Sequence, residues 1–287
     1  MSGSPQQPEQ TSPRCYRHGE RETWISCQRC GRPICPDCMR PASVGFHCPQ
    51  CVSAAESGQR TARKVAGGRV PAAPGRATLA LIGANLAVFV LVLGTGGSAS
   101  EVYQQSFMLT DSRPLFGLTG VDDGAWWRLL TSAFLHLQVL HIAFNMFALY
   151  VLGPPLERLV GQLRMVGIYL TTGLAGSVAV LWLGDPRIPT VGASGAVFGI
   201  FGAAIVLMRS RGYDISSLAM VLGINLVITF AVPNISWQAH LGGLLVGMAL
   251  GAVLAYTPRP RRRVAHPVAF VGLWTGLVLA VAAHVLL

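Results

Sequence analysis

Two short glycine-rich motifs in the second half of the chain contain the side chains best suited to covalent chemistry. One is VGASGA at residues 191–196, which contains Ser194, and the other is AHLGG at residues 239–243, which contains His240. A serine hydroxyl is a weak nucleophile until an adjacent base takes its proton, and imidazole is the commonest such base. If folding brings the two side chains together, they can act as a nucleophile and its general base.

Long apolar runs must position these two motifs. The chain is 52% hydrophobic and only 12% charged, whereas a soluble domain carries about 25% charged residues. A helix that crosses a bilayer needs roughly 20 apolar residues. Seven runs meet or approach this length: Ala77–Gly94, Thr131–Leu152, Met165–Leu183, Val191–Met208, Ile215–Val232, Ile235–Tyr256 and His266–Leu287. The composition therefore predicts an all-α polytopic membrane protein.

The distribution of basic residues predicts the orientation of these helices. With the N-terminus in the cytoplasm, 19 of the 22 Lys and Arg residues lie inside and three lie outside. The C-terminus is then outside, and the membrane is expected to be the cell membrane. We attribute the net charge of +10 to this excess of basic residues on the inner side of the membrane, and we do not expect a nucleic-acid partner. Ser194 and His240 are both expected several Å below the outer surface, because each follows the outer end of its helix by a few residues at about 1.5 Å per residue.

Small residues on the same helices favour close contact between them. Gly195 and Gly199 lie four apart on one helix, and Gly243, Gly247 and Gly251 continue this spacing on the other. No carboxyl group lies at matching depth within a helix, so the chemistry would be that of a Ser-His dyad. The alternatives are a serine bonded to its own helical turn, a histidine in a helix–helix contact and glycines that form a dimer seam.

These motifs, together with several others in the same order, resemble the rhomboid family of intramembrane serine proteases. The additional motifs are Trp127-Arg128, His136-x4-His141-x3-Asn145 and Gly153-x3-Glu157-x3-Gly161, and the resemblance covers approximately residues 77–257. It implies a six-helix core with a seventh C-terminal helix, Ser194 as nucleophile, His240 as base, and transmembrane segments of other proteins as substrates.

The resemblance also implies supporting roles for other residues. His141, Asn145 and the backbone at Gly192 and Ser194 would form or support an oxyanion hole. His136 is interpreted as a structural contact, and Glu157 as a residue that stabilises the fold. Phe198 stands where many relatives have tyrosine, so an aromatic ring can still stack on His240 but its hydroxyl is lost.

The N-terminal part of the chain has a pattern of metal ligands. Four pairs follow one another at a two-residue spacing: Cys15 and His18, Cys27 and Cys30, Cys35 and Cys38, and Cys48 and Cys51. Eight such ligands suffice for two tetrahedral Zn²⁺ ions. An odd number of cysteines and a reducing cytoplasm argue against the alternative, a disulfide framework.

The spacing of these pairs resembles the B-box zinc-finger family. That resemblance implies interleaved sites, with Cys15, His18, Cys35 and Cys38 in one and Cys27, Cys30, Cys48 and Cys51 in the other. His47 is an alternative to Cys48. Both ions would be structural, and such a head is expected to bind a cytoplasmic protein partner.

The chain is thus expected to comprise five segments: a disordered N-terminus (1–14), a zinc-binding head (15–51), a flexible basic linker (52–76), a six-helix membrane core (77–257) and a basic loop with the seventh helix (258–287). Two other functions compete with proteolysis. One is a catalytically weak or inactive rhomboid-like protein that binds membrane clients, although loss of serine or histidine is the usual mark of that class. The other is a small transporter, but the internal repeats expected of a transporter are not evident.

Overall fold

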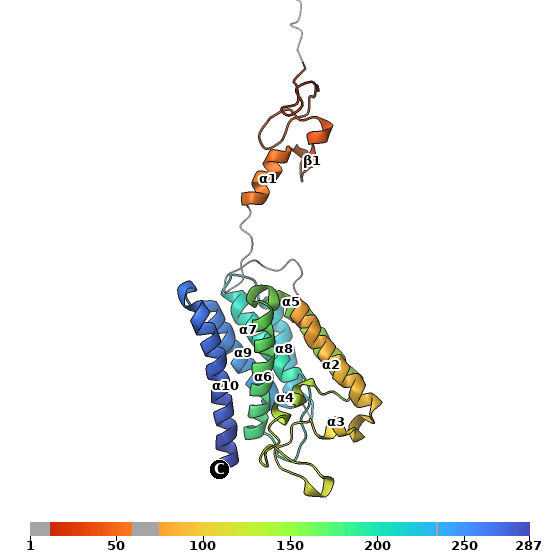
Figure 1. Ribbon diagram of the computed structural model, residues 1–287, viewed down its shortest axis with the longest axis vertical. Helices are drawn as coiled ribbons and strands as arrows, with labels where there is room; N and C mark the ends of the chain where they lie inside the picture. Colours follow the sequence, from red (N-terminus) through yellow and green to blue (C-terminus); the bar gives the residue numbers. More distant parts are fainter. Residues whose placement is uncertain (1–11, 59–74, 234) are drawn as a thin grey trace, which may run out of the picture. The chain divides into compact units, whose positions relative to one another are not determined.

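The computed structural model describes residues 12–58, 75–233 and 235–287 (Figure 1). The chain divides into two compact units, Met1–Thr61 and Ala62–Leu287. The expected disordered N-terminus lies mostly outside the described residues, and so do residues 59–74 of the expected linker.

The first unit is a small head with little regular structure. It contains a 3₁₀ helix η1 (Pro36–Cys38), a two-stranded antiparallel sheet of β1 (Arg40–Pro41) and β2 (Phe46–His47), and the helix α1 (Pro49–Gly58). Cysteine side chains and Ile34 form its interior. The linker was expected to start at residue 52, but α1 continues to Gly58, through a segment that contains the helix-favouring Ala54 and Ala55.

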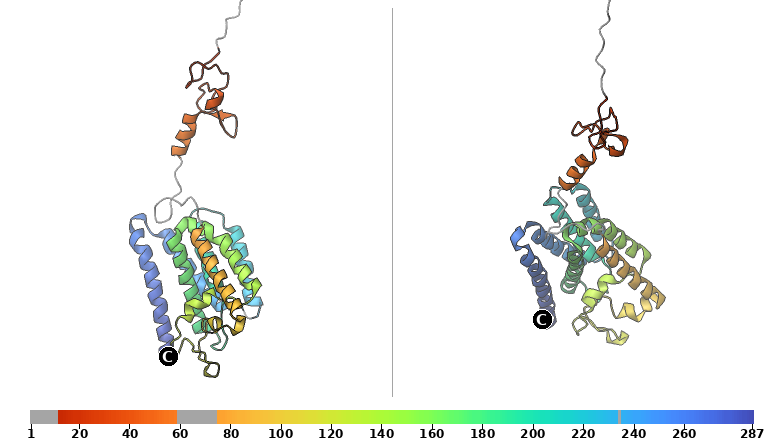
Figure 2. Two further views of the ribbon diagram at one scale, coloured as in Figure 1. Left: turned by 45° about the vertical axis from the view of Figure 1, so that its right-hand side comes forward. Right: turned by 45° about the horizontal axis from the view of Figure 1, so that its top comes forward.

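The second unit is a helical bundle (Figures 1 and 2). Its helices are α2 (Arg76–Gly94), α3 (Glu101–Gln104), α4 (Arg128–Thr131), α5 (Val139–Val160), α6 (Gln162–Leu183), α7 (Ser194–Arg209), α8 (Ser216–Ala231), α9 (Trp237–Tyr256) and α10 (Arg262–Leu286), with 3₁₀ helices η2 (Gly97–Ala99), η3 (Pro114–Phe116), η4 (Ser132–Phe134) and η5 (Arg259–Arg261). Five of these segments are long and apolar enough to cross a membrane: α2, α5, α6, α9 and η5 with α10. With the shorter apolar helices α7 and α8, the described residues contain the seven expected apolar helices, and the all-α membrane fold is confirmed.

The second of these helices does not have the predicted bounds. The expected run was Thr131–Leu152, but the chain is extended at Gln138 and α5 spans Val139–Val160. The prediction ended the helix before Pro154 and Pro155, yet α5 includes both prolines. At its other end, the segment between η4 and α5 leaves the helical conformation and His136 is fully buried there. Hydropathy does not distinguish this buried non-helical segment from a helix.

Glycines allow α7 and α9 to touch along their lengths. A Cβ atom added at Gly243 would lie 2.0 Å from the Gly195 carbonyl oxygen, and one added at Gly247 would lie 2.1 Å from the Gly199 carbonyl oxygen. These distances are far below van der Waals contact, so no larger residue fits without separation of the helices. The predicted small-residue contact therefore holds in the structure, and it fixes the two helices that carry Ser194 and His240.

A buried carboxyl group attaches α2 to the end of α5. Glu157 is 2% exposed and accepts hydrogen bonds from the backbone N–H of Thr78 at 2.9 Å, the Thr78 hydroxyl at 2.8 Å and the backbone N–H of Ala77 at 3.3 Å. These backbone N–H groups belong to the first turn of α2, which has no side-chain cap of its own. The interaction agrees with the expected stabilising role of Glu157.

Replacement of Glu157 by alanine is therefore expected to destabilise the bundle by about 1.5–3 kcal/mol, the range for hydrogen bonds to a charged group. The change leaves buried N–H donors without an acceptor. Thermal unfolding of the full chain in detergent micelles measures this effect as a lower midpoint. Glu101→Ala is the matched control, because Glu101 is exposed and should leave the midpoint unchanged. Equal midpoints for the two variants would contradict this role of Glu157.

Candidate active site and metal centre

The loop before α7 places Ser194 at the first residue of that helix. Gly192 has φ +124°, a conformation that side chains rarely adopt, and its N–H donates to the Ser132 carbonyl at 3.0 Å. Just upstream, Thr190 and Met108 exchange two backbone hydrogen bonds of 2.9 and 3.0 Å. Ser194 is half-buried here. It was expected a few residues after the start of its helix at Val191, but α7 begins at Ser194 itself. Because Ser194 is the first residue of α7, its backbone N–H has no acceptor within that helix.

His240 is the fourth residue of α9 and is 8% exposed. Its ring stacks on Phe198, with centroids 4.1 Å apart and planes 12° from parallel. Phe198 lies one helical turn after Ser194, and a Cβ atom added at Gly195 would lie 3.1 Å from the Ala239 carbonyl oxygen. The residues next to Ser194 and His240 are therefore in contact across α7 and α9, and the expected stacking of an aromatic ring on the histidine is present.

The two candidate catalytic side chains are not hydrogen-bonded to each other in the structure. Within residues 12–58, 75–233 and 235–287, no hydrogen bond joins the Ser194 hydroxyl to His240. The His240 Nδ1 atom instead lies 2.7 Å from the Thr229 hydroxyl oxygen. Catalytic hydrogen bonds are often long in the absence of substrate and tighten when it binds.

Histidine and asparagine side chains of α5 lie beside the loop that precedes Ser194. The His141 ring packs on Gly192, so that an added Cβ atom would lie 2.7 Å from His141 Nε2. Asn145 is 6% exposed and donates one side-chain N–H to the His141 carbonyl at 2.9 Å, which leaves its second N–H available. His141 and Gly192 are thus brought together, with Asn145 one turn further along α5.

His136 also lies next to this loop. The backbone N–H of Ala193 donates to His136 Nε2 at 3.4 Å, and the ring makes an edge-to-face contact with that of His141. A structural contact of His136 with the first loop was expected, but the contacts are with His141 and with Ala193, the residue that precedes Ser194. A small cavity with polar lining from Ser132 and Ser177 adjoins Gly192.

Thr229 is the site residue that the sequence did not indicate. It is one of three hydroxyl residues in α8, with Ser216 and Ser217, and a threonine within a helix is usually bonded to its own turn. A polar residue within a membrane helix is a general signal for function. Its partner His240 belongs to the next helix, so only the packing of α8 against α9 identifies the pair.

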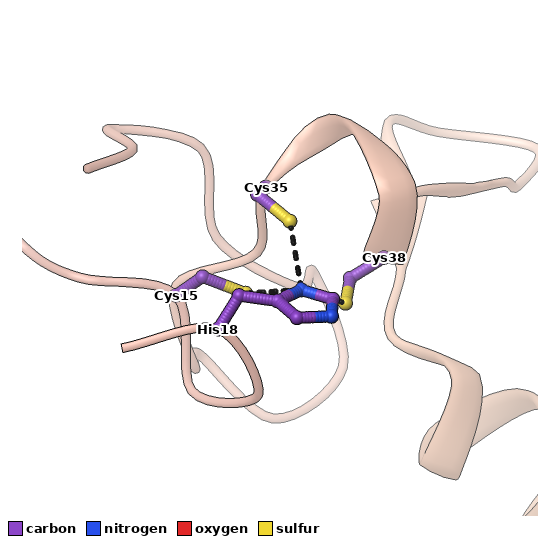
Figure 3. Close-up of side chains that lie close together, drawn as sticks. All are labelled: Cys15, His18, Cys35 and Cys38. Carbon is purple, nitrogen blue, oxygen red and sulfur yellow. Dashed lines mark hydrogen bonds between the residues drawn. The ribbon is translucent and has the colours of Figure 1, made fainter. Parts of the chain in front are cut away.

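The eight predicted metal ligands of the head form two groups, as the interleaved arrangement requires. Each group brings its four ligand atoms within 4.8 Å of one another: Cys15, His18, Cys35 and Cys38 in one, and Cys27, Cys30, Cys48 and Cys51 in the other (the first group is shown in Figure 3). Cys48, not His47, completes the second group. All seven cysteines are described and none forms a disulfide.

The spacing within the groups fits a tetrahedral ion. His18 Nδ1 lies 3.2 Å from Cys35 Sγ, 3.5 Å from Cys38 Sγ and 3.9 Å from Cys15 Sγ, and Cys30 Sγ lies 3.8 Å from Cys48 Sγ. Ligands at about 2.0–2.3 Å from a tetrahedral Zn²⁺ are about 3.3–3.8 Å apart, close to these distances. Burial and the neighbouring thiols raise the pKa of Cys38 to about 11, so a bound cation would stabilise its thiolate. The two groups can each hold a metal ion.

A buried small-residue seam between apolar helices, with polar side chains gathered at one end, defines an integral membrane protein with an internal polar site. Residues 123–257 match the rhomboid domain family. The chain is 35% identical over 188 residues to the rhomboid protease GluP of Bacillus subtilis (strain 168), which covers 62% of this chain and 34% of GluP. It is 35% identical over 136 residues to the putative rhomboid protease YdcA of the same organism. These residues cover 46% of this chain and 68% of YdcA.

A plant relative gives a similar result. RHOMBOID-like protein 2 of Arabidopsis thaliana is 30% identical over 214 residues, which cover 63% of this chain and 67% of that protein. The chain belongs to the rhomboid family. Its match spans only about a third of the length of GluP, and the family match starts at residue 123, well after the expected start at residue 77.

Proposed function

We propose that this chain is an intramembrane serine endopeptidase that cleaves transmembrane segments of other proteins near the outer face of the membrane. The observation that carries this proposal is the contact of Phe198 with His240, one turn from Ser194, at the glycine seam of α7 and α9. This seam fixes the backbones on which the nucleophile and the base depend. The presence of both residues argues against the inactive, client-binding alternative.

The reaction would proceed through an acyl-enzyme. Ser194 Oγ bonds to the substrate carbonyl carbon while His240 takes its proton, and negative charge develops on the carbonyl oxygen. The Ser194 N–H, the free Asn145 N–H and the His141 ring are the candidate donors for that oxygen. When the C–N bond breaks, His240 returns the proton to the leaving amine. Water then hydrolyses the ester in the reverse sequence, and the serine is regenerated.

The substrate must supply an accessible peptide bond. A helix uses its own carbonyl groups in hydrogen bonds, so a transmembrane segment has to unwind before Ser194 can attack. Segments with a small residue before the scissile bond and helix-weakening residues below it are therefore the proposed substrate class. The N-terminus is proposed to be cytoplasmic and the C-terminus outside, in the cell membrane, because this orientation keeps 19 of the 22 basic residues inside.

The proposal is tested by reconstitution of the full chain into vesicles with a transmembrane model substrate that carries an alanine near its outer end and helix-weakening glycine residues just below it. The expected result is one cut within the outer part of the apolar segment, mapped by mass spectrometry. Replacement of the helix-weakening residues by leucine should slow this cut. Cleavage confined to the water-soluble part of the substrate would overturn the proposal.

Asn145→Ala should lower kcat by a factor on the order of 10²–10³, as loss of one oxyanion donor does. The expected KM is unchanged, because the donor acts on charge that develops only in the transition state. Initial rates over a range of substrate concentrations in micelles separate the two constants. A raised KM with unaltered kcat would instead assign Asn145 to substrate binding.

For the head, we propose two structural Zn²⁺ ions, one for each group of four ligands. The support is the Cys/His donor set and its spacing, since soft thiolates with imidazole favour zinc. A site with four protein ligands leaves no open position for chemistry. The head is thus proposed to bind a cytoplasmic protein partner and to take no part in catalysis.

A further inference from the structure

One contact of the proposed base comes from a third helix. The Thr229 hydroxyl oxygen lies 2.7 Å from His240 Nδ1, and Thr229 is 3% exposed. Of the 16 residues of α8, all of them described, Thr229 is the only fully buried one. The one buried side chain of α8 is therefore in contact with His240, at its Nδ1 atom.

The direction of this hydrogen bond follows from the number of hydrogens available. Thr229 Oγ1 also lies 2.7 Å from the Asn225 carbonyl oxygen, which can only accept. A hydroxyl has one hydrogen, and the Asn225 carbonyl takes it. With the hydroxyl hydrogen directed to the Asn225 carbonyl, the Thr229 oxygen accepts from His240 and the Nδ1 atom carries the ring hydrogen.

The tautomer so defined is the one that a base requires. With hydrogen on Nδ1, the Nε2 atom of neutral His240 has a free lone pair and can accept the proton of Ser194. Phe198 fixes the plane of the ring by stacking, and Thr229 fixes its rotation within that plane. When the ring becomes doubly protonated during attack, the same oxygen stabilises the Nδ1–H.

We propose that Thr229 is a positioning residue that holds His240 in the Nδ1–H tautomer and completes the dyad from α8. This inference rests on the proposed function. It assigns to a neutral hydroxyl the orienting task that a carboxylate performs in a catalytic triad. The partner is neutral, so the expected effect is modest, about tenfold, which corresponds to one hydrogen bond of ordinary strength.

The test uses the full chain in detergent micelles and a fluorophosphonate, which reacts with an activated serine. Rates of labelling over a range of probe concentrations give the limiting rate kinact and the half-saturating concentration KI. Thr229→Val retains the shape of the side chain and removes the hydroxyl, while Thr229→Ser retains the hydroxyl. Thr257→Val is the control, since the Thr257 hydroxyl also donates to its own helix, at 2.6 Å to the Val253 carbonyl, but lies at the far end of α9.

The expected result is a kinact about tenfold lower in Thr229→Val with KI unchanged, within about twofold of wild type in Thr229→Ser, and unaltered in Thr257→Val. Wild-type kinact in Thr229→Val would overturn the inference. Equal losses in Thr229→Val and Thr229→Ser would also overturn it, because the methyl group and not the hydroxyl would then be responsible. Equal labelling of wild type and Ser194→Ala would instead show that the proposed function itself, and this inference with it, is wrong.

Discussion

Ser194→Ala and His240→Ala are each expected to reduce cleavage of a transmembrane substrate by a factor on the order of 10⁴ or more, and the double variant should be little worse. The two side chains act as a unit: without the base the hydroxyl is not activated, and without the hydroxyl the base has no proton to take. Effects of such residues do not add. Product formation by purified protein in micelles, followed over days, measures losses of this size.

Matched controls separate loss of chemistry from loss of fold. Ser210→Ala changes a serine just after the other end of α7, where its hydroxyl donates to the Leu207 carbonyl at 2.8 Å, and full activity is expected. Thermal midpoints of all variants should remain close to that of wild type. Full proteolysis by Ser194→Ala would overturn the assignment of the nucleophile. Loss in Ser194→Ala without loss in His240→Ala would require a different base.

Cys35→Ser is expected to lower the zinc content of the full chain from two ions to one and to unfold much of the head. Structural zinc contributes an apparent binding free energy of about 10–16 kcal/mol in zinc-finger peptides, most of which stabilises the fold. Cys35 is fully buried among the other ligands. Water therefore cannot take the place of its thiolate as a ligand while the group of four stays folded. Elemental analysis of purified protein gives the stoichiometry, and limited proteolysis of the head gives its folding.

Ser43→Ala is the control for this prediction, because Ser43 is exposed in the same unit and no metal ligand. It should retain two zinc ions and a protease-resistant head. Cleavage by the membrane unit should persist in Cys35→Ser, since the proposed catalytic residues belong to the other unit. A zinc content of zero in reduced wild-type protein would exclude the metal, and loss of cleavage in Cys35→Ser would indicate that the head is required for activity.

The sequence indicated those features that depend on local patterns. The two-residue spacing of the cysteine pairs predicted both ligand groups, because each knuckle supplies two ligands by itself. The glycines of α7 and α9 predicted the helix contact, since close approach leaves no other choice of residue. These signals lie in short segments and need no knowledge of the rest of the fold.

Features that depend on contacts between distant segments could not be predicted. The start of α5 was missed because hydropathy is the same for a buried extended segment and a helix, and the contact of His136 with the loop before α7 joins residues 57 positions apart. The role of Thr229 depends on how α8 lies against α9. The bonds of Glu157 to α2 join residues 79 and 80 positions apart in the chain.

The most direct test of the proposed mechanism is to locate the adduct of a fluorophosphonate probe on the full chain by peptide mass spectrometry. The hydroxyl that His240 activates should react faster than any other serine. The predicted result is a single adduct on Ser194, absent in Ser194→Ala and strongly reduced in His240→Ala. An adduct on a different serine, or equal labelling of wild type and Ser194→Ala, would contradict the assignment of Ser194 as the nucleophile.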